Sequence, residues 1–444
     1  MEVNLNKKEL ALHKKLATTP EQLPIDIDVV IPDYKPDALR ILKIVSNLSI
    51  NSATPSNGAV LLDGNIYFDI IYLTEEGKIA GLKAEQNLNH TIYFPENAIF
   101  QDADVFMYSA DGLVINSRKL GVRAVLSLSS KGYMEVKQEV TTDIEGEYEK
   151  SFNSLEYKTK NKIIEQKIAV RENAPSTGTG EILYATGKIV NTKEKIAGTK
   201  VLIKGDLELS YAELKDDSIN MSAKTIPFSE IVSLYGIDVA SENILSDTFS
   251  IYNDLEVSFD EFTAPEKVYK DIVEIEANGQ LQISDFENLV NWSTNSVITN
   301  ATADNGSLSL SGVLKVDLLY KTSTNYDSQK IKIPFDKKLS VTNNGKVYAS
   351  CENIDVVTEY LSSGILDIKA EIEVKVRIYK EIAKKYVSSV VENEAEKANK
   401  PYKLRVYYAK QNDTAWNIAK KFKIRENDIE DSDFSEGKKV VLQG

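Results

Sequence analysis

The chain has 444 residues, 42% of them hydrophobic, and a formal net charge of -14. A domain holds on the order of 150 residues, so this length predicts about three domains with apolar cores. The charge is uneven: residues 401–444 hold 9 Lys+Arg and 7 Asp+Glu, which leaves 44 and 60 in residues 1–400. A net of -16 on that body excludes general nucleic-acid binding, because phosphate contacts need a basic surface.

Cysteine usage and hydropathy limit the compartment. Cys351 is the one cysteine, which excludes an intrachain disulfide and a cysteine-based metal cage. Residues 1–16 are charged and lack the apolar core of a secretory signal. No apolar run reaches the roughly 18 residues of a membrane-spanning helix. We therefore expect a cytoplasmic protein without a membrane span.

The first 22 residues are predicted to form an amphipathic helix. Apolar side chains recur among lysines and glutamates, at Val3, Leu5, Leu10, Leu12 and Leu16. Such a helix could pack against the body or bind a partner as a peptide, and the sequence leaves both alternatives open.

Strand patterns begin at Ile25. Pro32 and Pro36 disfavour helix in the segment that follows. Alternating β-branched and aromatic runs then extend to about Ser127, and Gly77 closes a hairpin-type turn. Residues 141–160 have little periodicity and are expected to be either a linker or a charged edge strand.

A divergent repeat is the most informative internal pattern. Gly64, Gly205 and Gly312 each open a predicted strand with apolar residues two, four and six places on. A related segment precedes each copy, and a short strand containing Phe and Pro follows it. Offsets of 141 and 107 residues between the glycines indicate a domain duplication. We expect β domains over residues 23–145, 160–278 and 279–380, each a β-sandwich or open barrel.

The end of the third domain has a strict period of two. Every second residue from Leu366 to Ile378 is apolar, which predicts a long strand with one buried face. Residues 381–400 have apolar positions at helical spacing, including Val387, Val390 and Val391. They predict a helical linker that Pro401 ends.

Residues 401–444 differ from the body. A β-prone run ending at Tyr408 precedes a polar break, after which Asp413 or Thr414 can cap a short helix. The apolar face of this helix consists of Ala415, Ile418, Ala419 and Phe422. Trp416 lies at the edge of that face, and Lys420 and Lys421 are favourable charges in the last turn.

No catalytic constellation is evident. His13 and His90, expected in the N-terminal helix and in a turn, lack a carboxylate or cysteine at ligand spacing. The glycine-rich residues 176–180 lack the Lys-Ser/Thr of a P-loop. The acidic pairs at 75–76 and 216–217 are expected in solvated turns. We therefore expect no enzyme activity and no cofactor, with a hydrolase as a minor alternative.

The terminal residues resemble a LysM domain, a small βααβ fold. Residues 407–419 align without a gap to Tyr-x-Val-x-x-Gly-Asp-Thr-Leu-Trp-x-Ile-Ala, and residues 437–442 are similar to the closing strand. The family valine, glycine and leucine are replaced by Ala409, Asn412 and Ala415, and the second helix, residues 427–431, is short. The resemblance implies a glycan groove between the loops, which these departures alter.

The body resembles the SPOCS domains of spore-coat assembly proteins, through residues 30–42 and the three repeats. SPOCS-like repeats followed by one LysM domain are similar to the SipL-type family of clostridial spore-coat morphogenetic proteins. This resemblance implies a non-enzymatic scaffold in the mother-cell cytoplasm, at the forespore surface. Its LysM domain would bind the coat morphogenetic ATPase SpoIVA and tether the coat.

Two partner classes follow for the LysM-like domain: the SpoIVA-like ATPase with other coat proteins, or peptidoglycan through its N-acetylglucosamine polymer. The candidate partner-binding residues are Lys410, Asn412, Asp413, Thr414, Ala415, Trp416 and Lys420. Ile418 and Phe422 are expected in the small core, whereas Trp416 fits either the core or the binding surface.

Overall fold

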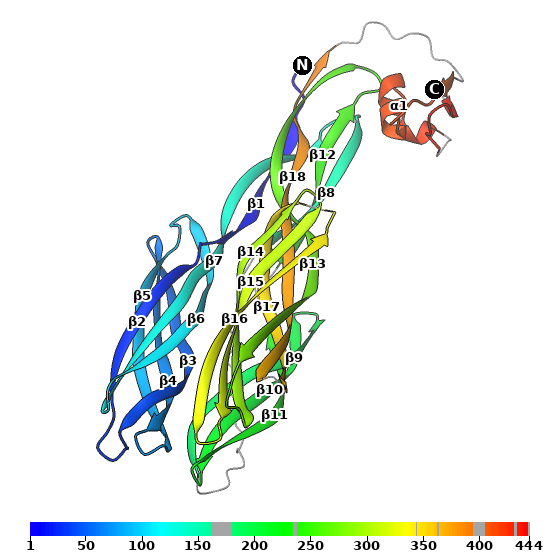
Figure 1. Cartoon of the computed structure of the whole chain (residues 1–444). Coiled ribbons are helices and arrows are strands. Elements are labelled where there is room, and N and C mark those ends of the chain that lie inside the picture. Colours follow the sequence, from blue (N-terminus) through cyan, green and yellow to red (C-terminus); the bar gives the residue numbers. More distant parts are fainter. Residues whose placement is uncertain are drawn as a thin grey trace.

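The computed structural model describes residues 1–160, 180–233, 238–342, 344–361, 364–393, 405–429 and 433–442. Strands β1 to β20 account for most of these residues, with one short α-helix and one 3-10 helix near the C-terminus. The prediction of a mainly β protein is confirmed. Two elongated groups of strands lie side by side and converge on a narrower stalk, beyond which the C-terminal unit lies (Figure 1).

Each copy of the repeat is the middle strand of a three-stranded sheet. The first sheet consists of β3 (Ala38–Ser56), β4 (Ala59–Thr74) and β5 (Ile79–Tyr93). The second consists of β9 (Glu181–Ala197), β10 (Lys200–Lys215) and β11 (Ser218–Ser233). The third consists of β14 (Asn288–Asp304), β15 (Ser307–Lys321) and β16 (Tyr326–Ser340). The preceding segment and the Phe-Pro strand of each copy flank the middle strand, as a true repeat requires.

The repeat glycines lie within these strands and do not open them, which corrects the prediction. Gly205 is paired with Phe228 and Gly312 with Phe335 on the neighbouring strand. A Cβ at Gly205 would lie 2.8 Å from Cζ of Phe228, and one at Gly312 would overlap the Phe335 ring. In these two copies glycine therefore makes room for an aromatic ring that lies across the strand, whereas Gly64 pairs with Leu88.

The first sandwich packs the β3–β4–β5 sheet against a second sheet of four strands. That sheet consists of β1 (Leu5–Ala17), β2 (Glu21–Val30), β6 (Ala98–Asn116) and β7 (Lys119–Ile144). Its core contains Ile66 and Phe68 from β4 and Leu126 from β7, all at most 1% exposed. The Arg118 guanidinium donates hydrogen bonds to the Ile31 and Lys35 carbonyls and thereby fixes the loop that contains Pro32 and Pro36.

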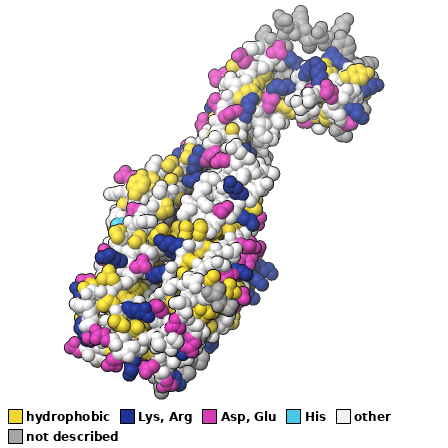
Figure 2. Space-filling model, viewed as in Figure 1, with side chains coloured by type: hydrophobic (Ala, Val, Ile, Leu, Met, Phe, Trp, Pro, Cys, Tyr) yellow, Lys and Arg dark blue, Asp and Glu magenta, His cyan; other side chains and the backbone are white. Residues whose placement is uncertain are grey.

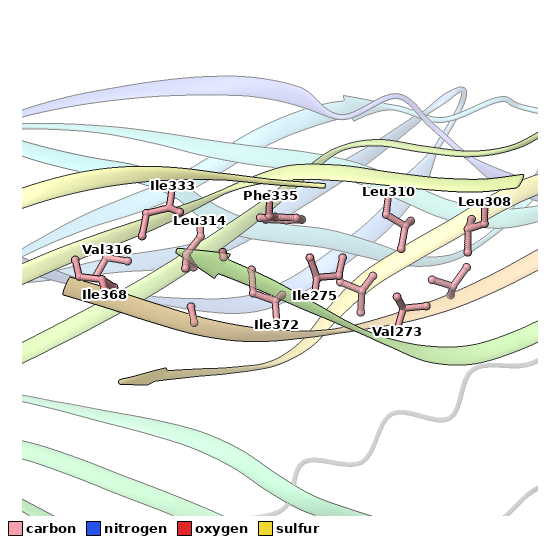
Figure 3. Packing of buried hydrophobic residues seen from close by; sticks show 14 of the residues in the cluster. Val273, Ile275, Leu308, Leu310, Leu314, Val316, Ile333, Phe335, Ile368 and Ile372 are labelled. Atoms are coloured by element: carbon pink, nitrogen blue, oxygen red, sulfur yellow. The ribbon is translucent and has the colours of Figure 1, made fainter. Parts of the chain in front are cut away.

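A second sandwich packs the β14–β15–β16 sheet against β13 (Asp254–Gln282), β17 (Lys346–Leu361) and β18 (Ile365–Asn393). Figure 3 shows side chains of β13, β15, β16 and β18 meeting between the two sheets. The alternating residues from Leu366 to Ile378 are all buried, so the predicted strand is confirmed. The residues between them in the sequence are all charged and project from the other face of the strand.

The stalk consists of β8 (Glu149–Lys160), its antiparallel partner β12 (Asp238–Phe249), and the ends of β1, β7, β13 and β18. Leu10, Leu155 and Ile244 belong to one of its apolar clusters, and Leu245 and Val390 belong to the other. β8 also resolves the alternatives for residues 141–160: most of them form strand and not linker.

The predicted helix over residues 1–22 is wrong. Residues 5–17 form β1, which pairs along its length with β7. Leu12 and Leu16 are four residues apart, a spacing that suits both periodicities, whereas the buried Leu10 and Leu12 are two apart, which suits only a strand. His13 accordingly lies in β1, and His90 lies in β5 and not in a turn.

The helical linker predicted over residues 381–400 is also wrong as far as Asn393, where β18 ends; residues 394–400 lie outside the described range. Ser389 pairs with Ser258 and Val387 with Phe259, so Ser388 is bulged out of the ladder. The bulge places the buried Val387 and Val390 three residues apart, which imitates helical spacing.

The sheets cross the domain boundaries expected from the sequence. β13 lies mostly within residues 160–278 but pairs with β18, whose core strand belongs to residues 279–380. β8 lies almost entirely in the interval between the first two expected domains and pairs with β12.

The C-terminal unit has a sheet of its own, since β19 (Arg405–Tyr408) pairs only with β20 (Lys439–Leu442) among the described strands.

The two sandwiches meet at a partly polar seam. Nζ of Lys43, on β3, is 2.7 Å from Oδ1 of Asn291 on β14, and Lys43 is 7% exposed. Burial lowers the pKa of Lys43 to about 8. Nζ of Lys315 donates to the Tyr108 carbonyl, and Lys330 pairs with Asp111. These contacts fix one sandwich beside the other.

Substituting Gly312 with alanine should destabilise the second sandwich. The new methyl group would overlap the Phe335 ring and the Val297 carbonyl, and such overpacking costs about 1–3 kcal/mol. Urea denaturation should give a lower unfolding midpoint. Gly187→Ala is the control, because its methyl would meet only the flexible end of Leu207, at 3.1 Å. Equal midpoints for the two variants would contradict the role assigned to the ring.

Candidate partner-binding surface

The C-terminal unit is a two-stranded sheet with one helix packed on it. β19 and β20 are antiparallel, α1 (Ala415–Phe422) follows β19, and η1 (Glu426–Asp428) is a single 3-10 turn. The predicted first helix is confirmed, and the second is reduced to that turn. Ile418, Ala419, Val440 and Leu442 are at most 2% exposed and form the centre of the unit. Ile418 therefore belongs to the core, as predicted.

The turn before α1 is tightly bonded. Thr414 is the N-cap: its Oγ1 accepts from the Asn417 N–H at 3.2 Å. Asp413 instead accepts from the Lys410 N–H at 2.7 Å and from the Tyr407 hydroxyl at 2.8 Å. These bonds, the first of them above all, lower the pKa of Asp413. Asn412 adopts a φ of 67°, the left-handed conformation that favours glycine or asparagine.

The seven predicted binding residues separate into three groups. Lys410, Asn412 and Thr414 are exposed in the turn, where the half-buried Asp413 maintains its geometry. Ala415 packs on the core of the unit. Trp416 and Lys420 lie four residues apart on α1, hence on one side of the helix, and this side contacts the body.

One carboxylate of the body receives both α1 side chains. Nε1 of Trp416 donates to Oδ2 of Asp247 at 2.9 Å, and Nζ of Lys420 lies 2.6 and 2.8 Å from the two oxygens. Both charged side chains are partly shielded from water, at 37% and 23% exposure. Asp247 is near the end of β12, at the tip of the stalk.

An aromatic contact lies beside that ion pair. The Phe249 and Trp416 ring centroids are 5.0 Å apart with the planes at 65°, an edge-to-face arrangement. Phe249 is 5% exposed and belongs to the apolar cluster of the C-terminal unit. Ile251 is partly buried and packs against the same cluster. Lys423, just after α1, pairs with Asp254 at the start of β13. We call Asp247, Phe249, Ile251 and Asp254 the docking segment.

The docking segment was not identified from the sequence. Asp247 is 169 residues from Trp416, and nothing local links them. The available signal was the alternation of two apolar residues, Phe249 and Ile251, at the end of a strand and just beyond it. That signal marks a covered surface without naming what covers it.

Other chemistry is sparse among the described residues. No three His, Cys, Asp or Glu side chains are grouped so as to hold a metal ion there. His13 packs on Tyr133, and Nε2 of His90 is 3.0 Å from Oε1 of Glu21. Cys351 is half-buried, and burial raises its pKa, which keeps the thiol protonated. Of the glycine-rich run only Gly180 falls within the described residues.

No protein-family model, curated protein or solved structure matches this chain. Within the part of the chain that the structure describes, no helix is long and apolar enough to cross a membrane. Figure 2 shows acidic and basic side chains interspersed over the visible face of the body. Two of the predicted binding residues, Trp416 and Lys420, contact the docking segment, so this face of α1 is the candidate partner-binding surface.

Asp413→Asn should loosen the turn in a pH-dependent way. Because the pKa of Asp413 is lowered in the folded chain, its stabilising effect is present above the unfolded value of about 4 and is lost as the pH falls through the folded value. At pH 7 the change in Trp fluorescence that reports unfolding should occur at a lower urea concentration in the variant than in the wild type. The gap should close as the pH falls below about 4.

Glu436→Gln is the control for this measurement, since Glu436 is exposed in the same unit. It should match the wild type at pH 7. A gap between Asp413→Asn and the wild type that persists unchanged at pH 2 would contradict a role for the ionised carboxylate.

Proposed function

We propose that this protein is a non-enzymatic scaffold in spore-coat assembly. It acts in the mother-cell cytoplasm at the forespore surface, and its C-terminal unit tethers the coat by binding a SpoIVA-like coat morphogenetic ATPase. The body consists of three SPOCS-like modules built on the repeated sheets, and the unit is a βααβ LysM-like domain. The observation that carries the proposal is the α1 surface, where Trp416 and Lys420 already bind protein side chains.

The repeated sheets support the scaffold assignment. Each copy keeps its middle strand, a glycine within that strand, and two flanking strands, although the sequences have diverged. Long strands run continuously from the second sandwich to the stalk, which holds the C-terminal unit beyond the two sandwiches. A rigid body that presents one small binding unit at its tip suits a tether.

The turn before α1 supports a protein ligand over a glycan. Asn412, which stands where the LysM motif has glycine, adopts a φ of 67° and adds a side chain to the loop. η1 is a single turn, so the second wall of a LysM glycan groove is reduced. By contrast, α1 presents an indole N–H and an ammonium group four residues apart, which together hold one carboxylate.

The test uses the full-length protein against the purified coat ATPase and against purified peptidoglycan. The wild type should bind the ATPase, and Lys420→Glu should weaken that binding at least about tenfold. The substitution puts a negative charge where the ammonium group of Lys420 would contact an acidic side chain of the ATPase. Lys439→Glu, an equal charge reversal at an exposed position of β20, should bind like the wild type.

Peptidoglycan binding that chitin oligomers compete away, without ATPase binding, would overturn the proposal. That result would instead support a LysM domain that binds the N-acetylglucosamine polymer of the cell wall or cortex.

A further inference from the structure

The contact between α1 and the docking segment uses a recognisable combination of groups. A carboxylate receives an indole N–H and an ammonium group, and an aromatic ring two residues farther along the same strand packs edge-to-face on the indole. Alternate residues of a strand project to the same side, so Asp247 and Phe249 reach α1 together. The α1 surface is thus complementary to an extended segment of the pattern acidic-x-aromatic.

The contact is also small and separate from the other cores. The described strands of the unit pair only with each other. The two ion pairs, the indole hydrogen bond and the aromatic contact described above all join it to the short docking segment. Its apolar cluster is distinct from those of both sandwiches and of the stalk. Interfaces of this kind within a chain resemble transient protein–protein contacts, and relative motion is expected across them.

Net charge favours docking without fixing it. The C-terminal residues carry +2 and the body -16, so the unit is attracted to the stalk, where Lys420 pairs with Asp247 and Lys423 with Asp254. Both ion pairs are partly exposed and are therefore weakened by salt. A partner with a similar acidic and aromatic segment would meet the same Trp416 and Lys420.

We propose that the docking segment is an internal competitor: it occupies the α1 surface until a partner protein displaces it with an extended acidic-x-aromatic segment of its own. The partner's identity rests on the proposed function, whereas the competition does not. When most molecules are docked, the apparent affinity for the partner is reduced by the fraction that is open. Opening the contact should therefore strengthen partner binding.

The first experiment detects opening without any partner. The chain has two tryptophans, so Trp292→Phe leaves Trp416 as the sole fluorescent indole. In this background D247K should shift Trp416 emission to the red and increase acrylamide quenching, and D247N should do so more weakly. D260K, a charge reversal at an exposed position of β13, is the control and should resemble the parent.

A second substitution guards against simple unfolding. D247K/K420D restores opposite charges across the contact and should recover part of the Trp416 shielding, which an unfolded unit would not do. Equal quenching of Trp416 in the parent, D247N and D247K would overturn the proposal, because the contact would then not depend on the carboxylate.

The second experiment uses a defined probe, a synthetic peptide with the sequence of residues 243–254. It should bind full-length D247K at least about tenfold more tightly than the wild type, whose site is occupied. The same peptide with asparagine in place of Asp247 should lose most of this binding. Equal binding to wild type and D247K, or no binding to either, would overturn the proposal.

Binding of the coat ATPase then distinguishes the internal competition from the identity of the partner. D247K should bind the ATPase about tenfold more tightly than the wild type, and D247K/K420D should bind it weakly. If the ATPase binds all variants equally, competition is contradicted. If the ATPase binds none of them while the peptide selects D247K, the proposed partner is wrong and the internal competitor stands.

Discussion

The pairing of β13 with β18 is the interaction on which the rest of the structure depends. These strands pair from Gln282 opposite Ile365 to Asp254 opposite Asn393, and only two bulges, at Ser258/Phe259 and Lys267/Tyr269, shift the register between them. At one end their alternating apolar residues form half of a sandwich core, and at the other they form part of the stalk. Because the docking segment ends where β13 begins, the same ladder determines where the C-terminal unit can lie.

This continuity links packing to function. The stalk holds its own apolar clusters, and Thr141 of β7 donates to the Val387 carbonyl of β18, so both sandwiches contribute to one rigid support. The α1 contact is different in kind, since it relies on one carboxylate, one aromatic pair and a second ion pair at the rim. A strong support and a weak terminal contact are the arrangement that an exchangeable binding unit needs.

Sequence patterns predicted the elements whose burial follows a simple period. The strand from Leu366 to Ile378, the helix over α1 and the three repeated middle strands were all identified in this way. The errors have a common physical cause. At Ser388 a bulge changed the spacing of buried residues, and at Leu12 and Leu16 a spacing of four suited both helix and strand, so distant pairing decided the outcome. Likewise Trp416 and Lys420 were predicted, but their contacts with Asp247 and Phe249 depend on the folded topology.

Amide hydrogen exchange of the full-length protein, with and without the coat ATPase, tests the central claim most directly. Exchange reports protection separately for α1 and for the docking segment. The account predicts that the ATPase keeps α1 protected, or protects it further, while residues around Asp247 and Phe249 become more exchangeable. Unchanged protection of the docking segment in an ATPase complex, with new protection elsewhere on the chain, would contradict it.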